Sequence, residues 1–186
     1  MSSGLRGDLG IALALGVVAV VLSIWAVPGL SGWLGAGLAL LMLPIAVIDV
    51  RHLIIPDELS AAALALALIH AATDADTSPL PAIGAALLRG LIVMALFWAL
   101  RLGYRRLRQR EGLGLGDVKL AFVAGAWLEA MMIPVAIEIA ALTALTGYLV
   151  THFVGKKPVD ARARLPFGLF FAPSIWLAWL LGAAVV

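Results

Sequence analysis

The stretch from Gly112 to Lys119, GLGLGDVK, places a carboxylate where a glycine-rich loop passes into an apolar segment. Glycines lack a side chain, so another chain can approach this backbone closely. The apolar run that follows, residues 118–127, predicts a membrane helix with Asp117 at its rim. A carboxylate there can cap the helix, or it can serve as a general acid or base beside a second carboxylate. The pattern is neither a P-loop nor a dinucleotide fingerprint, so it does not indicate a nucleotide site.

The composition is that of a membrane protein. Hydrophobic residues make up 63% of the chain, whereas soluble domains contain about half. The 186 residues leave no room for a second domain beside several spans, each of about 20 residues, so we expect one membrane-embedded domain over residues 1–186. Cysteine is absent and the three histidines are scattered, so we predict no disulfide, thiol nucleophile, metal site or cofactor. The net charge of +2 is too small to indicate nucleic-acid binding.

Seven apolar segments predict an all-α, polytopic helix bundle. They are Leu9–Val27, Trp33–Ile48, Leu59–Thr73, Ala82–Leu102, Asp117–Leu128, Ala130–Val154 and Phe167–Val186. The first is interpreted as a retained anchor and not a cleaved signal peptide, because its apolar run exceeds an ordinary h-region. Residues 28–32 predict a tight turn. Residues 49–58 predict a short connection, in which Pro56 biases Ile55 away from helix.

The basic residues indicate how the bundle is oriented. Strict alternation of seven spans places nearly all Lys and Arg residues on one side, which the positive-inside rule assigns to the cytoplasm. These residues are Arg6, Arg51, the group between 101 and 119, Lys156, Lys157, Arg162 and Arg164. Arg89, inside the fourth span, is the exception. The prediction is a multi-pass protein of the inner (cytoplasmic) membrane, with the N-terminus in the cytoplasm.

This orientation brings Asp49 and Asp117 to the same membrane boundary, because Asp49 ends the second span and Asp117 begins the fifth. Two carboxylates around one water cannot both ionise easily, so one stays a base and the other keeps a proton. The base would activate the water and the acid would protonate a carbonyl, which is aspartyl proteolysis. We expect both to face one cavity open to the cytoplasm, and we expect movement of the glycine-rich loop to close any gap between the two carboxylates in the substrate-free protein. Alternatively, both are helix-end residues solvated by headgroup water.

Three motifs in order carry a resemblance to a known family: Asp49 with the segment IPD at 55–57, GLGDVK at 114–119, and PFG at 166–168. They resemble the type IV prepilin peptidases, which belong to the GxGD class of intramembrane aspartyl proteases. The resemblance implies that Asp49 and Asp117 are catalytic. The residues expected to support them or to form a substrate loop are Gly114, Gly116, Lys119, Pro56 and Asp57.

The same resemblance implies an aspartic endopeptidase that cleaves the short basic leader from type IV pilin-like or pseudopilin precursors. Cleavage would take place at the cytoplasmic face of the lipid bilayer, just before the precursor's apolar helix. Larger members of the family carry a cysteine-bearing cytoplasmic domain between their first two spans, and the resemblance assigns N-methylation to it. Here that connection is five residues long without cysteine, so N-methyltransferase activity is not expected. Presenilin-like proteases share GxGD but pair it with a Pro-Ala-Leu motif that is absent from this chain.

Two other classes of function stay open at this stage. A small proton-coupled transporter would use Asp49, Asp117 and Glu138, although no inverted repeat is visible and the two aspartates lie at one face. A structural protein of a secretion system would leave the three motifs unexplained.

The remaining charged residues within or near the spans have structural interpretations. Arg89 and Glu138 lie within spans, which favours an ion pair or snorkelling over a proton path. His70 is expected near the outer interface. Lys119 is expected either to act electrostatically on Asp49 and Asp117 or to bind the substrate backbone, or else only to extend its amine to the membrane surface. The basic run from Arg101 to Arg110 is typical of topology signals and anionic-lipid contacts.

Overall fold

The computed structural model describes residues 2–74, 78–109, 112–155 and 166–185. Within these ranges the chain forms seven α-helices and no strand, so the predicted all-α class is confirmed. The helices are α1 (Ser2–Ala26), α2 (Leu30–His52), α3 (Asp57–Thr73), α4 (Pro79–Arg108), α5 (Leu115–Trp127), α6 (Met132–Gly155) and α7 (Phe167–Val185). The predicted basic loop at 156–164, Arg110 and the last residue of the seventh span lie outside the described residues.

The chain is a helical membrane protein. In lipid every backbone polar group must be satisfied within the protein, which favours helices. Four of the described helices are long and apolar enough to cross a membrane: α2, α4, the 132–151 part of α6 and the 167–184 part of α7. The apolar part of α1, residues 12–26, is shorter, as are α3 with 17 residues and α5 with 13. A helix the length of α5 extends about 20 Å, less than the roughly 30 Å of a bilayer core.

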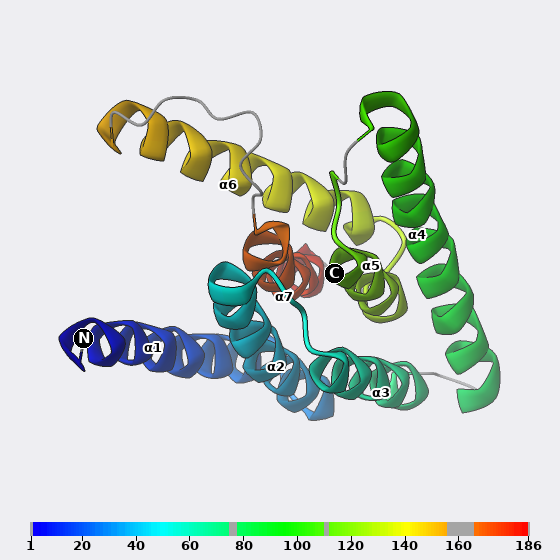
Figure 1. The fold of residues 1–186 in the computed structure, drawn as a ribbon. Coiled ribbons are helices and arrows are strands. Elements are labelled where there is room, and N and C mark those ends of the chain that lie inside the picture. The colour runs from blue at the N-terminus through cyan, green and yellow to red at the C-terminus, as the bar shows by residue number, and fades with distance from the viewer. Residues whose placement is uncertain (1, 75–77, 110–111, 156–165, 186) are drawn as a thin grey trace.

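Helices α5 and α7 lie in the middle of the bundle (Figure 1). Helix α5 packs against α3, α4 and α7, while α7 also contacts α2 and α6. Helix α1 packs on the outer side of α2. Nine of the 13 residues of α5 are buried, which agrees with a sequence that is apolar on nearly every face. The start of α5, which carries Asp117, is therefore surrounded by other helices.

Glycines allow α4 and α5 to pack closely. A Cβ atom at Gly90 would lie 2.5 Å from the ring of Phe122, and one at Gly125 would lie 2.8 Å from the carbonyl oxygen of Arg89. Both distances are shorter than real contacts, so only glycine fits at these positions. Small residues at helix crossings are the usual device for close packing in membranes.

Several helix boundaries differ from the sequence prediction in ways that matter for the site. Helix α2 begins at Leu30, which shortens the predicted 28–32 turn, and it continues beyond Ile48 to His52. The N–H of Leu53 donates to the carbonyl oxygen of Asp49 at 2.8 Å, and the left-handed conformation of Leu53 (φ 55°) then ends the helix. Asp49 therefore lies in the last turn of α2. Helix α5 begins at Leu115, two residues earlier than predicted, so Asp117 is its third residue.

Candidate active site

Asp49 is held by the first turn of α7. Its side chain is only 5% exposed, and its Oδ2 accepts a hydrogen bond from the N–H of Leu169 at 3.0 Å. The neighbouring amide of Gly168 also interacts with this carboxylate. The first N–H groups of a helix have no partner within the helix, so a carboxylate is favoured there. Asp49 thus links the end of α2 to the start of α7.

Gly168 makes this arrangement possible. A Cβ atom at this position would lie 2.8 Å from Oδ2 of Asp49 and 2.9 Å from Cδ1 of Ile55. Any other residue would have to displace the carboxylate, the isoleucine or the helix. The PFG motif contributed to the family resemblance, but the sequence did not reveal this role for its glycine.

Asp117 is held in a similar way by the start of its own helix. Its side chain is 7% exposed, and its Oδ2 accepts a hydrogen bond from the N–H of Gly114 at 3.0 Å. The capping interpretation of the glycine-rich turn is therefore confirmed. Capping does not exclude catalysis, because this bond uses one carboxyl oxygen and Asp117 has a second.

The fold brings Asp49 and Asp117 together, close enough for the charge on Asp49 to act on Asp117. Ile55 packs beside both, because it touches Gly116 next to Asp117 and Gly168 next to Asp49. Its side chain is 6% exposed. Both carboxyl groups are thus buried, so within the described residues they do not face the open cavity expected from the sequence. The physical reason is that the apolar Ile55 packs against the backbone beside each acid.

Comparison with known proteins gives the family of the chain. The sequence profile of the type IV leader peptidase family matches residues 36–149. The chain belongs to this family. It is 31% identical to a prepilin leader peptidase/N-methyltransferase of Pectobacterium carotovorum over 78% of this chain and 50% of the relative. The relative of the same name in Pseudomonas aeruginosa is 30% identical over 76% of this chain and 47% of its own length.

The chain spans about half the length of the curated relatives it matches. A third relative, the prepilin leader peptidase/N-methyltransferase of Dichelobacter nodosus, is 30% identical over 74% of this chain and 45% of the relative. No solved structure matches the chain significantly.

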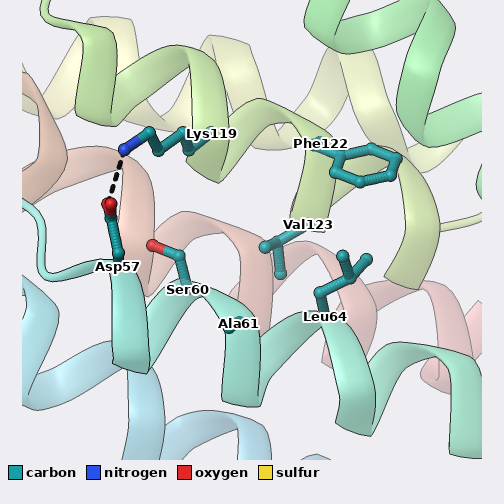
Figure 2. Close-up of a pocket in the computed structure, with 7 residues that line it drawn as sticks. All are labelled: Asp57, Ser60, Ala61, Leu64, Lys119, Phe122 and Val123. Atoms are coloured by element: carbon teal, nitrogen blue, oxygen red, sulfur yellow. Dashed lines mark hydrogen bonds and ion pairs between the residues drawn. The ribbon is translucent and has the colours of Figure 1, made fainter.

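In this member of the leader peptidase family, Lys119 and Asp57 pair with each other and not with the two buried acids. Lys119 Nζ lies 2.5 Å from Asp57 Oδ1, and the Asp57 side chain is largely exposed while that of Lys119 is about half exposed. The pair lies at one end of a groove between α3 and α5 (Figure 2). The volume of this groove is about 210 Å³. Neither Asp49 nor Asp117 lines this groove.

Pro56 has a local structural role. It adopts an extended conformation (φ −62°, ψ 136°) just before the first residue of α3. Its carbonyl oxygen accepts hydrogen bonds from the N–H and the hydroxyl of Ser60, at 3.2 Å and 3.1 Å. Pro56 therefore ends the α2–α3 connection and begins α3 at Asp57.

Arg101 supports the glycine-rich loop, which the sequence did not predict. Its Nη1 donates a hydrogen bond to the carbonyl oxygen of Leu113, and its charge also acts on Asp117. The basic run had been interpreted as a topology signal, and only the tertiary contact separates Arg101 from the exposed arginines that follow it. The loop that we expected to move is thus tied at Leu113 and again at Gly114.

The other charged and aromatic candidates lie apart from the two acids. Glu138 is exposed on α6, whereas both aspartates are buried, so the transporter interpretation gains no support. His70 stacks on Trp127 with ring centroids 4.4 Å apart, and its Nε2 lies 3.0 Å from the hydroxyl of Ser31. Arg89 is half-buried, and its Nε has no hydrogen-bond partner among the described residues. In the part of the chain that the structure describes, no three His, Asp or Glu side chains gather to hold a metal ion.

Proposed function

We propose that residues 1–186 form one membrane-embedded aspartyl endopeptidase domain with Asp49 and Asp117 as its catalytic pair. The observation that carries this proposal is that two buried carboxylates from different helices lie together, each held through Oδ2 by a backbone N–H. Such hydrogen bonds fix the orientation of a carboxylate and leave its other oxygen for chemistry. A preorganised pair of this kind is what acid–base hydrolysis requires.

The proposed reaction needs one ionised and one protonated carboxyl group. The ionised group takes a proton from water while the water oxygen bonds to the scissile carbonyl carbon. The protonated group gives its proton to the carbonyl oxygen, which forms a neutral tetrahedral intermediate. When that intermediate collapses, the carbon–nitrogen bond breaks, and the leaving amine receives the proton that the first carboxylate took from the water. One hydroxyl of the intermediate returns its proton to the second carboxylate as the new carboxyl group forms. The pair shares a proton again at the end, so each turnover consumes only water and the peptide bond.

The proposed substrates are type IV pilin-like or pseudopilin precursors, cut between a short basic leader and an apolar helix. Family membership supports this substrate class, and the placement of the basic residues supports a multi-pass protein of the cytoplasmic membrane with its acids at the cytoplasmic face. For residues 1–186 we propose peptide-bond hydrolysis only, and no N-methyl transfer.

The test is to substitute each acid by its amide. Asp49→Asn and Asp117→Asn should each lower leader cleavage by at least about 100-fold, because the amide can neither take nor supply the proton. Cleavage of a purified precursor is the measurement, and helical circular dichroism checks folding. Glu58→Gln is the matched control, because Glu58 is an exposed carboxylate in the first turn of α3. Full activity in either aspartate variant would exclude the catalytic pair.

A further inference from the structure

The space beside the two carboxylates is occupied by a side chain of the α2–α3 connection. Ile55 is 6% exposed and contacts the backbone at both Gly116 and Gly168. At Gly116, a Cβ atom would come within 2.8 Å of Ile55 Cβ. The isoleucine therefore lies against the backbone beside both acids and covers it.

The segments around the site differ in how much their movement would disturb the acids. The glycine-rich loop supplies the N–H that holds Asp117, and the start of α7 supplies the N–H that holds Asp49. Displacing either would therefore displace a carboxylate. The connection Leu53–Pro56 contributes Ile55 to the site, but in the described structure it donates no side-chain or backbone hydrogen bond to either carboxyl group. Only Leu53 is tied to an acid, because its N–H donates to the backbone carbonyl of Asp49, so the part of the connection beyond Leu53, with Ile55, is the segment whose movement leaves both carboxyl groups in place.

The connection can move without breaking a helix, although displacing Ile55 takes its side chain out of the hydrophobic core. Its residues are outside the helices, and Leu53 adopts a left-handed conformation that is unfavourable for a leucine. Beyond it, the start of α3 is tied to α5 by the Lys119–Asp57 ion pair (Figure 2). Exposed ion pairs are weak, and both partners can return to water when the pair breaks.

We propose that Ile55 is a plug, displaced when the precursor's scissile segment enters between Asp49 and Asp117. This inference rests on the proposed function and adds to it a residue that controls access to the two acids. In the substrate-free protein, Ile55 keeps the two acids covered. On binding, the precursor's backbone takes the space of the isoleucine side chain, and Ile55 swings out with the connection. The Lys119–Asp57 pair then acts as a latch that biases the connection towards the closed position.

The chain contains no cysteine, so a single introduced thiol can report this movement. The variant Ile55→Cys is made together with Asp117→Asn, so that bound precursor is not cut. The purified protein is treated with a water-soluble maleimide, with and without a precursor peptide that has a basic leader and an apolar helix. Labelling should be slow without the peptide and roughly tenfold faster with it, because binding shifts a rare open state to a dominant one.

Two further variants make the test specific. Ile54→Cys is the matched control, because Ile54 is 62% exposed and should label rapidly with or without peptide. Adding Lys119→Gln to Ile55→Cys should speed labelling without peptide, because the latch is lost. The unsubstituted protein is tested for cleavage of the same peptide. If it cleaves the peptide but the peptide leaves labelling of Ile55→Cys unchanged or slower, the plug is excluded and the proposed function stands. Failure of the unsubstituted protein to cleave the peptide would overturn the proposed function and the plug with it.

Discussion

At the scale of single residues, the site depends on positions where no side chain fits. Gly168→Ala should lower cleavage by roughly 100-fold, because its Cβ atom would push the Asp49 carboxylate out of position, and displacements of about 1 Å can have effects of this size. The measurement is kcat/KM for a precursor peptide. Gly103→Ala is a suitable control, since a Cβ atom there meets nothing within 4 Å. Equal activity in the two variants would mean that Gly168 does not set the position of Asp49.

At the scale of elements, the short helix α5 is fixed through the loop before it. Arg101 on α4 bonds to the carbonyl of Leu113, and Gly114 bonds to Asp117. Arg101→Gln should lower kcat roughly tenfold, which corresponds to the loss of one hydrogen bond from a charged group. Arg105→Gln removes the same charge from an exposed position on the same helix and should retain activity. If both variants lose activity equally, the basic run acts through topology or lipid, as the sequence alone suggested.

At the scale of the whole molecule, the two acids lie at one end of the bundle. Asp49 is in the last turn of α2, Asp117 is in the first turn of α5, and the first turn of α7 meets them there. A precursor can present an extended bond at that level only where its apolar helix emerges. Moving the scissile sequence four residues into the helix should therefore abolish cleavage, because the bond would be helical and out of reach.

Gel analysis of cleaved and uncleaved precursor measures this effect. In the control precursor the leader is altered, but the scissile bond stays at the junction between leader and apolar helix. A soluble peptide that lacks the apolar helix should be cleaved poorly. Unchanged cleavage of that peptide would show that the membrane helix contributes nothing to recognition.

The sequence by itself determined the class of fold and the approximate helices, and it predicted Asp49 and Asp117 as the candidate pair. Long apolar segments must become helices in lipid, because no water is available to satisfy the backbone. The glycine-rich stretch before Asp117, Pro56 and the basic residues are local signals that can be read in order along the chain. The helix boundaries in the structure differ from the predicted ones by a few residues, because caps such as Leu53 and Gly114 depend on individual hydrogen bonds.

Only the tertiary structure decided how these parts meet. Asp49 is held by Leu169, 120 residues further along the chain, and Lys119 pairs with Asp57 across 62 residues. Ile55 and Gly168 lie within the IPD and PFG motifs and Arg101 begins the basic run, but nothing local in the sequence reveals what each of them contacts. Their roles arise because α2, α4, α5 and α7 pack together around the two carboxylates, and sequence spacing does not encode such long-range contacts.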